Sequence, residues 1–148
     1  MLSVSSVVIN ATTPFVLNGN ITNTVSGFNM TFNAPLTLGT NAALTGTSGN
    51  IIFNSTVDSN ISGPWNLTVS ETGGGLAFPG GPGVVIFNGI VGGSNPLNNL
   101  SVDASFGIGL NTSAITTVGT QSYNPNIVVA PSVYLQSAAI NLTAPTVN

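Results

Sequence analysis

The sequence predicts an all-β protein folded as a parallel β-solenoid, and three observations support this prediction. Leu, Glu, Lys and Ala do not recur at the 3.6-residue spacing of a helix. Short runs of Val, Ile, Thr and Phe alternate with small polar residues, which is typical of strands. Phrases of strand and turn also recur along the chain. Because a rung of a solenoid buries its inward side chains only against its neighbours, recurring apolar positions favour this fold.

Alternating runs mark the expected strands, and Asn-Gly, Gly-Gly, Ser-Gly and Asn-Pro pairs mark the turns between them. The clearest runs are residues 6–10, 28–32, 50–53, 66–69, 84–87, 99–102 and 127–129. Side chains in a strand point alternately to its two faces, so every second residue of a run is expected inside. The predicted inward residues are Ile51, Phe53, Leu67, Val69, Val85, Phe87, Leu100 and Val102.

Two internal repeats support a solenoid. Residues 52–57 and 64–69 recur as residues 86–91 and 96–102, after a shift of 32 to 34 positions. A longer copy begins near Leu17, and from Phe32 onward its offset is a constant 91 positions. We therefore expect one full repeat unit and part of a second. The alternative fold is a β-sandwich of about seven to nine short strands, but the recurrence of whole strand-turn phrases favours the solenoid.

The whole chain, residues 1–148, is expected to form a single β-solenoid domain, since its length suits one domain. The Gly/Pro-rich segment 73–83 has no Lys and no helix after it, so it is interpreted as an insertion between rungs rather than a phosphate-binding loop. The first residues lack the basic and apolar segments of a signal peptide. No stretch approaches the ~20 apolar residues of a membrane helix.

The composition argues against most reactive chemistry. The 148 residues include no Lys, Arg, His or Cys, and the only acids are Asp58, Glu71 and Asp103. General acid–base catalysis and metal binding need clustered side chains of these types. Binding to nucleic acids or anionic membranes needs Lys and Arg. We therefore expect no enzymatic activity, no cofactor, no metal, no nucleic-acid partner and no membrane insertion.

Three further features each have two interpretations. Asp58 and Asp103 could hold calcium with backbone carbonyls, but solvated or turn-capping carboxylates are the simpler expectation. Trp65, beside Pro64, is either a platform for a sugar ring or a filler at the edge of a rung. Nine Asn-x-Ser/Thr sequons could carry glycans that solubilise the surface, or asparagine could recur because it suits turns. The sequons begin at Asn10, Asn20, Asn29, Asn54, Asn60, Asn66, Asn99, Asn111 and Asn141.

Several strand-turn phrases resemble the β-strand repeats of large bacterial surface proteins of the filamentous-haemagglutinin and autotransporter-passenger kind. These phrases are residues 49–58, 85–93, 99–103 and 115–124, and the resemblance extends over residues 17–143. It implies a secreted or surface-held parallel β-helix used in adhesion, biofilm or fibre formation. The chain departs from those giant proteins in its short length and its lack of basic residues, and both departures favour a self-assembling subunit.

We therefore expect an extracellular or cell-surface structural protein, the protomer of a self-assembling fibre or filament. Only 2% of its residues are charged, and neutral, strand-rich chains tend to associate. Copies are expected to join end to end through the first and last strands, at Val7, Ile9, Ile140 and Leu142. One alternative is an adhesin or carbohydrate-binding β-helix fragment that contacts glycans or host or cell surfaces. Another is a pilus-like subunit joined by strand addition.

Overall fold

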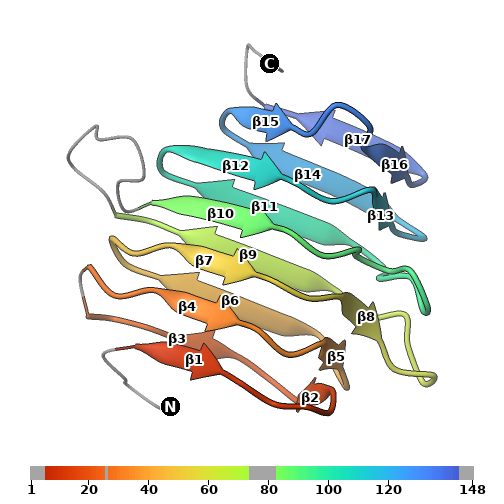
Figure 1. Cartoon of the computed structure of the whole chain (residues 1–148). Coiled ribbons are helices and arrows are strands. Elements are labelled where there is room, and N and C mark those ends of the chain that lie inside the picture. Colours follow the sequence, from red (N-terminus) through yellow and green to blue (C-terminus); the bar gives the residue numbers. More distant parts are fainter. Residues whose placement is uncertain (1–5, 26, 74–82, 144–148) are drawn as a thin grey trace.

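A computed structural model of the chain describes residues 6–25, 27–73 and 83–143. These residues form strands and turns without any helix, and accordingly none that could cross a membrane. All neighbouring strands are parallel, and they wind into six coils that stack along one axis. The first and last coils lie at opposite ends of the stack (Figure 1). The predicted parallel β-solenoid is confirmed.

Each coil contributes to three faces, which we name A, B and C. Face A consists of β1 (Val7–Ile9), β4 (Met30–Phe32), β7 (Ile51–Phe53), β10 (Val84–Phe87), β12 (Gly107–Leu110) and β15 (Ile127–Val129). Face B consists of β2 (Phe15–Leu17), β5 (Leu36–Leu38), β8 (Val57–Ser59), β13 (Ala114–Thr116) and β16 (Tyr134–Gln136), with Val91 bridging β8 and β13 in the fourth coil. Face C consists of β3 (Ile21–Thr22), β6 (Ala42–Gly46), β9 (Leu67–Glu71), β11 (Leu100–Ala104), β14 (Thr120–Asn124) and β17 (Ala139–Leu142).

Inward side chains of successive coils stack into columns that fill the interior. The best defined column holds the rings of Phe32, Phe53 and Phe87, whose centroids lie 5.1 and 4.7 Å apart in nearly parallel planes. Their strands pair in register at these residues, so like side chains meet like side chains. All eight predicted inward residues are buried, with exposed fractions of 1% or less. The predicted alternation is therefore confirmed at every one of these positions.

The true repeat is one coil, and the longer repeat expected from the sequence is wrong. An uninterrupted coil separates Met30 from Ile51, whereas insertions at two corners lengthen the next step, from Ile51 to Val85. The 34-residue shift found in the sequence corresponds to the length of this longer coil. The 91-residue offset instead relates Phe32 on face A to Tyr123 on face C. Because every face uses the same alternation of apolar and polar residues, this shift by three coils plus two faces matches as well as a whole number of coils.

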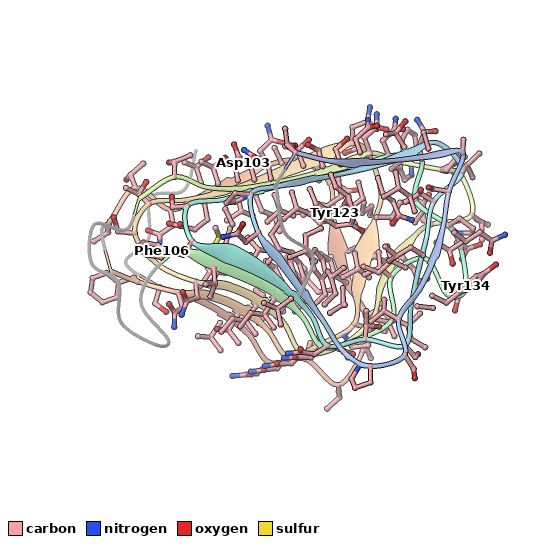
Figure 2. All side chains as sticks on the ribbon, turned by 90° about the horizontal axis from the view of Figure 1, so that it is seen from above. Asp103, Phe106, Tyr123 and Tyr134 are labelled. Atoms are coloured by element: carbon pink, nitrogen blue, oxygen red, sulfur yellow. The ribbon has the colours of Figure 1, made fainter. Side chains whose placement is uncertain are left out.

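A few polar side chains lie inside the stack. The Gln121 Nε2 group donates to the carbonyls of Ile115 (3.1 Å) and Gln136 (2.9 Å), and the Tyr123 hydroxyl donates to Gln121 Oε1 (2.9 Å). Figure 2 shows Tyr123 pointing into the interior, and this burial raises the pKa of its hydroxyl. Gln136 belongs to the last coil, so the Gln121 side chain ties that coil to the fifth.

The predicted insertion at 73–83 is described only at its two ends, since residues 74–82 lie outside the described ranges. Before it, the Thr72 N–H donates to the Gly46 carbonyl at 3.2 Å, and after it, the Gly83 N–H donates to the Gly49 carbonyl at 2.9 Å. β9, before the insertion, belongs to face C and β10, after it, belongs to face A, and both sheets continue on either side of these strands.

Candidate assembly surfaces

The predicted assembly residues lie in the first and last coils. Val7 and Ile9 are inward residues of β1 and are only partly buried. Ile140 and Leu142 are 42% and 45% exposed, although their register with buried Gln121 and Tyr123 directs them inward. Their side chains are exposed because no described coil lies beyond them. Each end coil therefore carries inward apolar side chains that are not fully buried, although Ile127 of the last coil is only 3% exposed.

Backbone hydrogen bonds repeat from coil to coil along one corner of face A. In five successive steps, the carbonyl of an inward residue accepts the N–H of a residue in the next coil, at 2.8 or 2.9 Å. The same step repeated would use the Asn10 N–H at the first coil and the Val129 carbonyl at the last. The two ends are thus complementary, because one supplies the donor and the other the acceptor. The donor–acceptor pairs are Asn33–Ile9, Asn54–Phe32, Asn88–Phe53, Asn111–Phe87 and Ala130–Leu110.

Asparagine side chains stack at this corner, and we name the stack the amide ladder. Its members are Asn10, Asn33, Asn54, Asn88 and Asn111, one in each of the first five coils. The Nδ2 group of each later member donates to the Oδ1 atom of the member before it, at 2.6, 2.7, 2.7 and 3.1 Å along the stack. Ala130 takes this position in the last coil. All four bonds run in the same direction, from the later coil to the earlier one.

The structure gives the sequon asparagines roles in hydrogen bonding, which explains why asparagine recurs. Amides at equivalent corners satisfy the polar groups of neighbouring turns. Glycosylation of these residues stays a prediction. Asn10, Asn54 and Asn111 belong to the amide ladder, Asn20 and Asn29 accept from the N–H groups of Ala43 and Asn50, Asn66 and Asn99 are joined on face C, Asn60 accepts from Trp65, and Asn141 donates to Ser122.

The aspartates and the tryptophan stabilise turns and edges. Asp58, on face B, accepts the N–H groups of Ser94 (2.8 Å) and Asn95 (3.2 Å). Asp103 lies on the outer surface of face C (Figure 2) and accepts from the side-chain amide of Asn124. Across the described ranges, no group of three or more His, Cys, Asp or Glu residues could hold a metal ion. Trp65 is partly buried and packs against the core, as expected of a filler at the edge of a rung.

Glu71 is a buried acid that the sequence interpretation missed. Its side chain is 1% exposed, and its Oε1 atom accepts the Gly49 N–H at 3.1 Å. Among the described residues, Oε2 has no hydrogen-bond partner. Desolvation raises the pKa of Glu71, and this effect outweighs the nearby N–H groups of Gly49, Gly73 and Ser48, which lower it. The signal was present in the sequence, because Glu71 continues the inward alternation of Leu67 and Val69.

The class of this protein is defined by its fold, because comparison with known proteins finds no match. No protein-family model, curated protein or solved structure matches the chain. The fold defines a parallel β-solenoid of six coils with three faces and two complementary ends. Its function is therefore argued from the chemistry of those ends and faces.

Proposed function

We propose that this protein is the protomer of an extracellular surface filament in which copies stack end to end. The complementarity of the two end coils carries this proposal. In the stacked arrangement, the Val129 carbonyl of one copy accepts the Asn10 N–H of the next and adds a sixth step to the series of five. Both ends have the same three-faced outline, since every coil contributes to the same three sheets.

Apolar contacts complete the joint. In the stacked arrangement Val129 covers Ile9 of the next copy and Leu142 covers Ile21, because these residues occupy the same columns and are not fully buried in the single chain. Burying such surfaces contributes roughly 25 cal/mol per Å². Joining unlike ends gives a heterologous contact that does not close, so the assembly grows as a filament.

A location outside the cell is part of the proposal. The resemblance to repeats of bacterial surface proteins supports it, as does a composition with only 2% charged residues. Polymerisation gives such a neutral chain a soluble, ordered state, since stacking covers both open sheet edges. Glycans on exposed asparagines would add hydration.

Two variants that block opposite ends test the joint. Ile140→Glu places a charge on the last coil, and Val7→Glu places one on the first, so either charge would be buried without a partner in the joint. We expect each variant alone to remain monomeric and the wild type to form filaments. An equimolar mixture should give dimers only, because each variant keeps the end that the other lacks. Analytical ultracentrifugation and negative-stain electron microscopy measure both results.

The matched control is Val118→Glu, which adds the same charge at a side chain 59% exposed on the flank of the stack. This variant should form filaments like the wild type. Circular dichroism establishes that all variants keep their β structure. A wild type that stays monomeric at high concentration would falsify the proposal, and so would a mixture of the two blocked variants that contains no dimer.

Carbohydrate binding by a lateral face is a second candidate function, and a groove beside face B favours it. The groove combines apolar rings and an aliphatic side chain with hydroxyl, amide and carboxylate groups, a mixture that suits a sugar. Ile61 at its rim is 93% exposed. Its lining includes Pro14, Pro35, Thr37, Asp58, Ile61 and Asn95. Calorimetric titration with neutral oligosaccharides should show saturable heat that Asp58→Asn weakens, and the absence of heat with the wild type would exclude this function.

Strand addition, the third alternative, has less support. β1 already pairs with β4 of its own chain at Val7, Val8 and Ile9. Donating this strand to another copy would break that pairing, whereas end-to-end stacking keeps it.

A further inference from the structure

The outer surface of face A carries a continuous column of mostly aliphatic side chains, which we name the aliphatic strip. Consecutive strands align its members in register. The two end members, Val8 and Val128, are 52% and 57% exposed. None of the three acids of the chain lies on this surface, since Asp58 and Asp103 belong to the other two faces and Glu71 is buried. The members are Val8, Thr31, Ile52, Ile86, Gly109 and Val128.

A notch interrupts the strip at β12. Gly107 and Gly109 leave a hollow between Ile86 and Val128, with Phe106 at its rim. Neither glycine has a left-handed backbone, and an added Cβ would make ordinary contacts, the nearest at 3.6 Å from Ile86 for Gly109 and 3.5 Å from the Asn126 carbonyl for Gly107. The fold therefore does not require glycine here. Glycine weakens a strand interior and often marks a place where another chain approaches closely.

We propose that the aliphatic strip docks against the same strip of a second copy, so that filaments pair side by side in opposite directions. The proposal rests on the proposed filament. A two-fold axis parallel to the strands and midway between β10 and β12 brings Ile86 of each copy opposite Gly109 of the other. The notch of each copy then receives the isoleucine of its partner. Ile52 meets Val128 in the same arrangement, because both coils are equally far from the axis.

The size of the strip explains why the partner is a filament rather than a single copy. Six strands spaced about 4.8 Å apart and three residues wide present about 290 Å². A stable pair of proteins needs about 800 Å² from each partner. Within a filament the strip continues across every joint, since Val128 of one copy precedes Val8 of the next. Many weak contacts then act together, and their combined strength grows with filament length.

Two variants test the pairing without altering the filament joint. Gly109→Val fills the notch from within, and a Cβ added at Gly109 makes only ordinary contacts with its neighbours. Ile86→Thr removes the residue that enters the notch. The matched control is Thr68→Val, which adds an aliphatic side chain to the outside of face C. Negative-stain electron microscopy and low-speed sedimentation distinguish single from paired filaments. We expect pairs and bundles for the wild type and Thr68→Val, and single filaments of unchanged length for the other two.

Each outcome decides one of the two proposals. Filaments of the wild type that remain single, or filaments of Gly109→Val that pair as the wild type does, overturn the docking of the strip and leave the end-to-end joint standing. A wild type that forms no filament overturns the joint, and the pairing fails with it, because one strip is too small to hold two chains.

Discussion

Phe53 lies in the middle of the stacked rings of Phe32 and Phe87 and is fully buried. Replacing it with alanine removes the ring contacts on both sides and leaves a cavity that the neighbouring coils cannot close. We expect Phe53→Ala to lower the free energy of unfolding by about 3–5 kcal/mol, and Phe87→Ala by a similar amount. Urea denaturation measures the change. Wild-type stability in both variants would show that these rings do not pack as described.

Glu71 gives the protein an unusual dependence of stability on pH. With only three acids and two tyrosines, stability should otherwise be nearly flat between about pH 5 and 9. Burial raises the pKa of Glu71 above 4.5 in the folded state. The neutral carboxyl is therefore favoured by folding, and its contribution is complete below about pH 4.5 and lost as pH rises through the folded-state pKa. We expect the melting temperature to fall over that interval.

Glu71→Gln is the matched control, because it keeps the size of the side chain and cannot ionise. Its melting temperature should be independent of pH in the interval where that of the wild type falls. Thermal unfolding followed by circular dichroism at a series of pH values makes the comparison. Parallel pH profiles for the two proteins would mean that another group causes the change.

The amide ladder ends one coil early, and this allows its contribution to be measured. Ala130 occupies the ladder position of the last coil, and its N–H already makes the equivalent backbone bond to Leu110 at 2.9 Å. An asparagine there could donate to Asn111 Oδ1. We expect Ala130→Asn to raise the free energy of unfolding by about 0.5–1.5 kcal/mol, the usual range for one hydrogen bond. Chemical denaturation provides the measurement.

Val118→Asn is the control for this variant, since it introduces the same side chain at an exposed site outside the ladder. Its stability should stay close to that of the wild type. Equal effects of the two substitutions would assign the gain to surface polarity rather than to stacking of amides. In the stacked filament, an asparagine at position 130 would also accept from Asn10 of the next copy, so Ala130→Asn should assemble at lower concentration.

Strands and inward residues could be predicted from the sequence where large apolar residues such as Val, Ile, Leu and Phe occupy the inward positions. The expected run 50–53 contains β7, and the run 99–102 contains most of β11. The strands of face B were missed, and so were β6 and β14 of face C, although each of these two has five residues. In β6 two of the three inward residues are Ala42 and Gly46, and in β14 one of the two is Gln121, so the apolar alternation is weak there. The length of one coil was also obscured, since insertions at the corners change the spacing between equivalent residues.

The candidate assembly surfaces could also be predicted only in part from the sequence. Placing Ile140 and Leu142 at an open end needed only their apolar character and their position late in the chain. The notch at Gly109 could not be predicted, because it depends on which residues of three separate coils lie side by side. Glu71 was missed for a different reason, since its inward alternation was visible but a carboxylate is rarely fully buried.

The whole filament should be insensitive to salt. Neither end coil contains a charged side chain, so the proposed joint would rely on backbone hydrogen bonds and apolar contacts. Screening at about 1 M salt weakens interactions between charges but leaves such contacts intact. We expect the sedimented fraction of filaments to stay constant or to rise as sodium chloride is increased from low concentration to that value. Filaments that dissolve in salt would require an ionic contact at the joint.

The small rise of each coil along the solenoid axis determines the mass per unit length of the proposed filament. Six coils rise only about 29 Å, so a chain of 14.8 kDa gives a single filament of about 5 kDa per nanometre. Side-by-side pairing doubles this linear density to about 10 kDa per nanometre without changing the repeat along the axis. Scanning transmission electron microscopy of unstained specimens weighs such objects directly. A proposed fibre one micrometre long would contain about 350 copies of this chain per strand, and these 148 residues include no cysteine, histidine, lysine or arginine.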